Sequence, residues 1–386
     1  MPVQTIIAST HILDASSQST FEGALAISDD QIAAIGSLDE MKAFAAEENT
    51  GSTPAEIRDF GDAFVSPGFH DSHVHFFHSS VYSSNLAASF LGKNELDCVE
   101  RMKELAKKRP HGWLLSQGWR EYRWDDPRVP SKHSLDAVFP NRPVALYSGD
   151  AHTLWLNSCA LKTLGISNNS KAPEGGSYDR DEHGELTGIA REAAAMELMP
   201  KIMGAFTNEE FAEAYRGFFK RLGQNGITSV CDLSLMALPG LDFIRDDVHE
   251  MLLERGQLTS RVNMFPTLLA DTSRFERMYE HFRGPLLSCN GLKQFFDGVS
   301  SQHTAWLNKP YTNARFEGDC GRPTIDPEDM HALIMNAASH GWPVRVHTIG
   351  DEAIHVLLDF FEEARKTYGP LPHGLHNGME HLENFQ

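Results

Sequence analysis

The sequence predicts an α/β protein built on a parallel (β/α)8 barrel. From about residue 205 the apolar residues alternate between helical and strand spacing, which is typical of consecutive βα units. Such a barrel takes roughly 250 residues, so a chain of 386 residues leaves room for further modules. A His-x-His sequence follows Pro67-Gly68 and indicates functional side chains on the first barrel strand.

Residues 1–65 predict a small antiparallel β unit that precedes the barrel. Strand-like runs occur at 5–8, 24–27 and 32–36, and an Asp29-Asp30 turn lies before the third run. Because these runs are so close together in the chain, we expect them to pair as antiparallel neighbours.

Residues 66–79 predict the first barrel strand and a pair of metal ligands. Alternation along a strand sends His73 and His75 to the same side, while Val74 packs on the other side. Neutral imidazole is the commonest metal ligand in proteins, so both rings could hold one ion. The alternative is a pair of hydrogen-bonded core histidines, since the chain contains 19 histidines. Asp71 is a candidate hydrogen-bond partner for these rings.

Residues 80–204 do not continue a regular βα pattern. Apolar residues from Leu96 to Leu105 have helical spacing, aromatic-rich loops follow, and residues 181–184 carry a hairpin signal. The segment therefore predicts mixed short elements rather than barrel strands.

Residues 205–386 predict the remaining barrel strands. Thr207 and Glu210 form a capping box that begins a helix, and Pro327 favours the first turn of another helix that begins at Asp326. A further helix is expected from Asp351 to Gly369. Strand-like runs lie at 227–231, 261–269, 291–296, 344–347 and 376–381. If the strand at 66–79 is the first, His347 ends the fifth strand and His381 ends the sixth.

Lys293 stands out within the apolar run at 291–296. An unpaired ammonium is costly to bury, and catalytic groups of such barrels lie at the C-terminal ends of strands. The amine could be neutral and carboxylated by CO2, or it could be a lysine whose amine reaches water at a strand end. Asp297 is either its hydrogen-bond neighbour or a turn residue. His347 and His381 are further candidate ligands, with buried, hydrogen-bonded histidines as the alternative.

Composition excludes several classes of function. The chain has 53 acidic and 34 basic residues, so its formal charge of −19 disfavours binding to a nucleic acid backbone. No apolar stretch approaches the roughly 20 residues that cross a bilayer, and no signal peptide is evident. The five cysteines lack C-x-x-C spacing, which favours reduced thiols. We expect a soluble, cytoplasmic protein without nucleic acid or membrane partners, and a homo-oligomer is compatible with the sequence.

An ordered series of motifs resembles the amidohydrolase superfamily, and most closely amidohydrolase family 3, the branch that includes N-substituted formamide deformylase. The series extends over nearly the whole chain. Its segments are Pro67 to His75, Asp150 to Ser158, Gly175-Gly176, Gly184 to Gly188, Lys293 to Gly298 and His347 to Asp351.

The resemblance implies a truncated metallo-dependent hydrolase barrel. Residues 1–65 would be the N-terminal part of a small β-sandwich, 66–79 barrel strand one, 80–204 an insertion subdomain, and 205–386 strands two to six. Strands seven and eight are absent, so we expect a fragment of a longer protein. A second chain that completes the barrel, or an inactive metal-binding remnant, are the alternatives.

The resemblance also implies a metal-dependent hydrolase of non-peptide C–N bonds, of the amide or formamide type, that acts on a small-molecule substrate through metal-activated water. Cyclic amides, C–O bonds or P–O bonds are alternative targets. Two Zn²⁺ ions are expected, with iron or manganese as alternatives. The catalytic aspartate of the family, on strand eight, would lie beyond Gln386. His152 and Trp119 are candidate substrate contacts, although Trp119 could equally be a core residue. The implied metal ligands are His73, His75, carbamylated Lys293, His347 and His381.

Overall fold

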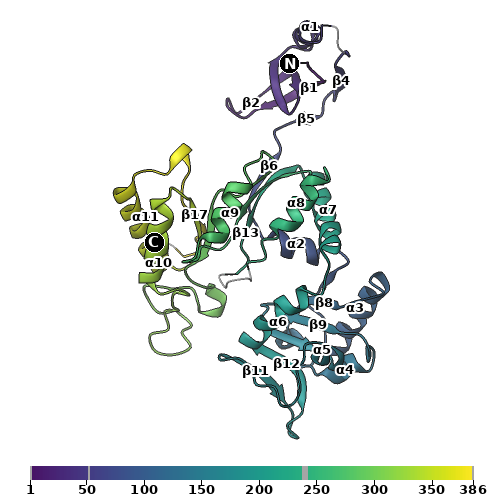
Figure 1. Cartoon of the computed structure of the whole chain (residues 1–386), viewed down its shortest axis with the longest axis vertical. Helices are drawn as coiled ribbons and strands as arrows, with labels where there is room; N and C mark the ends of the chain where they lie inside the picture. The colour runs from purple at the N-terminus through teal and green to yellow at the C-terminus, as the bar shows by residue number, and fades with distance from the viewer. Residues whose placement is uncertain (1, 51–52, 237–241, 385–386) are drawn as a thin grey trace. The chain divides into compact units, whose positions relative to one another are not determined.

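The computed structural model describes residues 2–50, 53–236 and 242–384 (Figure 1). The chain divides into two compact units, Met1–Phe69 and His70–Gln386. None of the helices within the described residues is long and apolar enough to span a membrane.

The first unit is a five-stranded sheet with one helix. Its order is β3-β2-β1-β4, with β5 paired to β1, and α1 begins with a capping box between Ser37 and Glu40. The predicted antiparallel pairing holds for β1 with β2 and for β2 with β3, but β4 and β5 run parallel to β1. The helix between β3 and β4 carries the chain back across the sheet, which permits the parallel return. The elements are β1 (Thr5–Asp14), β2 (Ser19–Ser28), β3 (Gln31–Gly36), α1 (Leu38–Glu48), β4 (Glu56–Asp59) and β5 (Phe64–Val65).

Within the second unit, residues 87–203 form a mixed sheet with its own helices (Figure 1). The strand order is β11-β12-β10-β9-β8-β7, and the predicted hairpin at 181–184 is confirmed between β11 and β12. We call this sheet the six-stranded sheet. Its elements are β7 (Ala87–Ser89), α3 (Glu95–Lys108), β8 (Leu114–Trp119), η1 (Glu121–Arg123), α4 (Lys132–Asp136), β9 (Val144–Ser148), β10 (Thr153–Leu156), α5 (Ser158–Thr163), β11 (Gly176–Arg180), β12 (Leu186–Glu192) and α6 (Ala193–Met203).

The rest of the second unit alternates strands and helices, which confirms the predicted mixed α/β fold. The strands form one sheet of order β15-β14-β13-β6 and another of order β16-β17-β18. A parallel bridge between Thr267 and Lys293 joins the two sheets. The elements are β6 (Phe69–Val74), α2 (Phe76–Tyr82), α7 (Asn208–Gln224), β13 (Ile227–Leu233), α8 (Asp246–Glu254), β14 (Arg261–Phe265), α9 (Ser273–His281), β15 (Leu287–Ser288), β16 (Leu292–Phe295), η2 (Ser300–Gln302), α10 (Pro327–Ser339), β17 (Val344–Thr348), α11 (Asp351–Tyr368), η3 (Pro372–Gly374) and β18 (Gly378–His381).

Local signals in the sequence predicted several of these boundaries. The Thr207–Glu210 capping box begins α7, Pro327 occupies the first turn of α10, and α11 ends before Gly369. The predicted strand at 261–269 is shorter, because β14 ends at Phe265 and Pro266 has no N–H to donate. His75 also lies outside its predicted strand, as the residue that precedes α2.

A buried polar pair fixes the beginning of α2 against β13. Asp232 on β13 accepts a hydrogen bond from the backbone N–H of Phe76 at 3.0 Å, and its other oxygen lies 3.2 Å from Nε2 of His249 on α8. Asp232 and His249 are 1% and 0% exposed, and burial raises the pKa of Asp232. The rings of Phe76 and Tyr215 pack against that of His249, so α2 begins at a fixed place against β13.

Replacement of Asp232 by alanine is expected to destabilise the second unit by about 3–5 kcal/mol, because a buried partner of His249 is lost and the Phe76 N–H loses its acceptor. Urea denaturation followed by tryptophan fluorescence measures the shift. Glu100→Ala is the matched control, since Glu100 pairs with Lys103 on an exposed helix surface and its loss should cost no more than about 1 kcal/mol. Equal shifts in the two variants would refute the anchoring role of Asp232.

Candidate functional site

Four imidazoles from three strands of the second unit meet in a continuous series of ring contacts. The ring centroids of His73 and His75, at the end of β6, lie 5.2 Å apart. His73 lies 4.9 Å from His381 on β18, and His381 lies 4.5 Å from His347 on β17. Residues more than 300 positions apart in the sequence therefore share one site, and all four histidines predicted as metal ligands belong to it.

Lys293 on β16 is the fifth predicted ligand, and its amine is buried without a partner. The residue is 0% exposed, and Nζ has no hydrogen-bond partner among the residues that the structure describes. It lies 5.0 Å from the ring centroid of Phe295, which in turn contacts His347. Burial lowers the pKa of Lys293 to about 7, because the uncharged amine is easier to remove from water. The amine is therefore partly neutral at neutral pH.

Two of the imidazoles are held as neutral rings. Burial lowers the pKa of His75 and of His347 to about 4 each, with smaller contributions from the neighbouring histidines and Lys293. Nδ1 of His75 lies 2.9 Å from the carbonyl oxygen of Leu233, and Nε2 of His347 lies 3.1 Å from that of Gly298. A carbonyl oxygen only accepts, so these nitrogens carry the protons. Nε2 of His75 and Nδ1 of His347 keep their lone pairs for a ligand.

The ring of His73 has a carboxylate partner that the sequence analysis missed. Its Nδ1 lies 2.7 Å from Oε2 of Glu380, whereas Asp71, the predicted partner, accepts the backbone N–H of His73 at 3.1 Å. Asp71 thus serves the backbone of its own strand. The signal for Glu380 was its position directly before His381.

Glu380 and His381 both reach the site because the backbone departs from a regular strand. Successive side chains of a strand point to opposite faces, but His381 has φ of 78° and the following Leu382 has φ of 51°. Both values lie in the left-handed region that non-glycine residues rarely occupy. This distortion brings two adjacent side chains to the same histidine.

The donor set fits a divalent cation in its chemistry. Neutral imidazoles and a desolvated amine that lacks a partner are groups that a cation would satisfy. No three His, Cys, Asp or Glu side chains in the described ranges, however, are arranged as a ready-made group for one ion. The four imidazole rings contact one another in series, and Lys293 adds a nitrogen donor that is not one of these residue types. The fit therefore rests on the unpartnered Nζ of Lys293 and the free ring nitrogens.

Asp297, predicted as a neighbour of Lys293 or a turn residue, has a different role. Its carboxylate accepts the backbone N–H groups of Ile349 and Gly350, at 2.9 and 2.7 Å, and that of Trp306 at 3.0 Å. Asp297 is 1% exposed. It therefore ties the loop that follows β16 to the loop that follows β17, directly after His347.

Of the two predicted substrate contacts, Trp119 lies on β8 of the six-stranded sheet and His152 lies directly before β10. Trp119 is 1% exposed, its Nε1 donates to the carbonyl oxygen of Leu146 at 2.9 Å, and its ring packs on Trp155. Trp119 is thus a core residue and not a pocket wall, because its ring and its polar atom are both enclosed. His152 is accessible, and its Nδ1 lies 2.7 Å from Oε2 of Glu192.

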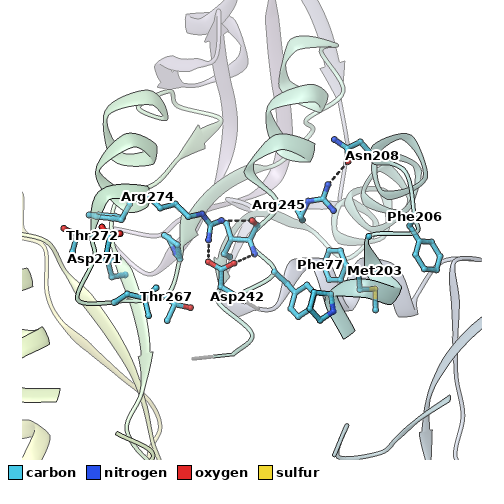
Figure 2. A pocket seen from close by; sticks show the side chains of 18 residues that line it. Phe77, Met203, Phe206, Asn208, Asp242, Arg245, Thr267, Asp271, Thr272 and Arg274 are labelled. Carbon is cyan, nitrogen blue, oxygen red and sulfur yellow. Dashed lines mark hydrogen bonds and ion pairs between the residues drawn. The ribbon is translucent and has the colours of Figure 1, made fainter. Parts of the chain in front are cut away.

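A cavity of about 550 Å³ lies apart from the histidines (Figure 2). Asp242 and Arg274 point toward each other on one side of it, while Phe77 and Met203 line another side. Leu292 also lines this cavity, and alternation along β16 directs Lys293 to the opposite face of the strand. The cavity is therefore separated from the histidine site by β16.

Comparison with known proteins identifies the family. Residues 56–383 match the amidohydrolase family. The chain belongs to the amidohydrolase family. This confirms the resemblance that its motifs indicated.

Relatives of this chain include the putative amidohydrolase YtcJ of Bacillus subtilis (strain 168), which is 29% identical over 361 residues. N-substituted formamide deformylase of Arthrobacter pascens is 26% identical over 356 residues. The alignments include 93% and 89% of this chain but only 65% and 62% of the relatives, so the chain spans less than two thirds of either protein. An uncharacterized metal-dependent hydrolase from Pyrococcus furiosus has a similar structure, with a TM-score of 0.71, 26% identity, and coverage of 94% of this chain and 70% of that one.

Acidification is expected to destabilise the metal-free amidohydrolase chain through His75 and His347. Their pKa of about 4 in the folded state lies below the ordinary value of 6.5, so between those values the unfolded chain binds protons that the folded chain excludes. Stability should fall as pH is lowered through this window. Urea midpoints at about pH 7.5 and about pH 5 measure the loss.

The double variant His75→Gln/His347→Gln should lose less stability over the same pH interval than the wild type does. His355→Gln is the control, since the His355 side chain is 75% exposed on α11. A wild-type loss no larger than that of the double variant would show that the two rings are not kept neutral by burial.

Proposed function

We propose that this chain contains the metal-binding part of a hydrolase that cleaves a non-peptide C–N bond of an amide or formamide. The observation that carries the proposal is the meeting of four imidazoles with the buried, unpartnered amine of Lys293. The relative named N-substituted formamide deformylase supports the choice of bond. The substrate would be a small molecule with an amide-like carbonyl group.

The proposed site lies within a (β/α)8 barrel. One sheet places β6, β13 and β14 side by side in the order in which they follow along the chain, and the other sheet does the same with β16, β17 and β18. The bridge between Thr267 and Lys293 links the two sheets. These six strands would be barrel strands one to six. Residues 1–65 would contribute to a small β-sandwich, and 80–204 would be an insertion after the first strand.

The proposed ligands of two divalent cations, Zn²⁺ or alternatively iron or manganese, are His73, His75, Lys293, His347 and His381. Such cations supply Lewis acidity, which polarises a carbonyl group and lowers the pKa of water. The protein residues supply the rest. His75 and His347 present unprotonated nitrogens because backbone carbonyls hold their other nitrogens, and the loops tied together by Asp297 keep His347 in place.

Lys293 would act as a carbamate. Its nitrogen, neutral after loss of a proton, attacks the carbon of CO2; an N–C bond forms, one C=O π bond becomes a carboxylate, and the nitrogen releases a second proton to solvent. Burial favours this reaction, because it lowers the pKa of the amine to about 7. The product exchanges an unpartnered donor for two oxygen atoms that can bind cations.

His152 would contact the substrate. Glu192 holds its ring through Nδ1, and both Ala151, with φ of 64°, and Glu192, with φ of 51°, adopt left-handed backbone conformations. Such strain is often found at functional sites, which supports the assignment of this segment.

Metal analysis of the purified chain tests the proposed function. Inductively coupled plasma mass spectrometry should find about two equivalents of divalent metal per chain, and Lys293→Ala or His347→Ala should reduce this content severely, because each change removes a ligand. His355→Ala, on the exposed surface of α11, should keep the wild-type content. Full metal content in both ligand variants would overturn the site.

A further inference from the structure

Glu380 uses both carboxylate oxygens to join three strands. Oε2 lies 2.7 Å from Nδ1 of His73 on β6, and Oε1 lies 3.2 Å from Nη1 of Arg345 on β17. The same Nη1 donates to the carbonyl oxygen of Ser72 at 2.6 Å. Glu380 itself is on β18, so the contacts hold β6, β17 and β18 together beside the histidines.

This network is more enclosed than an ordinary surface ion pair. The side chains of Glu380, His73 and Arg345 are 13%, 20% and 26% exposed. The guanidinium of Arg345 also lies over the ring of Phe265, 5.1 Å from its centroid. The carboxylate of Glu380 is held at both oxygens, because Oε1 faces the guanidinium of Arg345 and Oε2 faces Nδ1 of His73.

The carboxylate decides which nitrogen of His73 carries the proton. An ionised carboxylate only accepts hydrogen bonds, so Nδ1 of His73 is the protonated nitrogen of the neutral ring. Nε2 is then left with its lone pair. A carboxylate partner also raises the basicity of a ligating imidazole and fixes the orientation of its ring.

We propose that Glu380 is a positioning residue that fixes the ring and tautomer of His73, so that Nε2 is presented to a divalent cation, while Arg345 holds the carboxylate in place. The inference rests on the proposed function, since it assigns a partner to one of the proposed ligands. Glu380 itself would not be a ligand of the cation, because its two oxygens face His73 and Arg345.

Glu380→Gln tests the inference, because it keeps the shape of the side chain and removes the charge. We expect the affinity for Zn²⁺, measured by competition with a chromophoric chelator, to fall about 10- to 100-fold. The nitrogen-15 chemical shifts of His73 in the metal-free chain should also move toward a mixture of tautomers. Glu380→Asp is a second variant, which keeps the charge but shortens the reach to Nδ1, and it should give an intermediate loss.

Glu363→Gln is the matched control. Oε2 of Glu363 lies 3.1 Å from Nε2 of His331, with side-chain exposures of 56% and 33%, so this change also breaks a glutamate–histidine pair but in another place. It should leave both the Zn²⁺ affinity and the shifts of His73 unchanged.

The outcomes separate this inference from the proposed function. Tight Zn²⁺ binding in the wild type, with equal affinity and unchanged His73 shifts in Glu380→Gln, would overturn the role of Glu380 and leave the proposed function standing. A wild type that does not bind Zn²⁺ would overturn both, even if the shifts of His73 respond to the substitution.

Discussion

The site depends on the removal of basic groups from water. Lys293, His75 and His347 would all be better solvated as cations, and burial keeps them partly or wholly neutral instead. This costs folding free energy, which the large apolar core of the second unit must offset. Several nitrogen lone pairs are therefore available in one place, whereas protonated amines and imidazoles at the surface would have no lone pair for a cation.

Two buried carboxylates maintain this arrangement from outside the histidine cluster. Asp232 fixes the residue that follows His75, and Asp297 fixes two residues that follow His347. Each accepts backbone N–H groups at the point where a strand gives way to a loop or helix. Backbone carbonyls of Leu233 and Gly298 then set the direction of the rings. The precision of the site thus comes from strand ends that are tied to their neighbours.

The sequence predicted features that depend on local chemistry. The capping box at Thr207 and the first turn at Pro327 each follow from a few neighbouring residues. The ring contact between His73 and His381 required the family resemblance, because no local rule joins residues so distant in sequence. Glu380 escaped prediction for the same reason. For Trp119 the sequence left a core residue and a pocket wall as equal alternatives, because composition does not separate the two. The parallel return of β4 depended on the path of α1 across the sheet.

The left-handed backbone at His381 is unfavourable for histidine, although the proposed site uses an imidazole at this position. Glycine or asparagine would adopt φ of 78° with less strain, so selection for thermal tolerance alone would favour either of them there. An imidazole at this position thus opposes the conformational preference of the chain. Directed evolution toward higher stability would favour substitutions at the end of β18 first, and a screen for folded protein alone would not detect the loss of the imidazole.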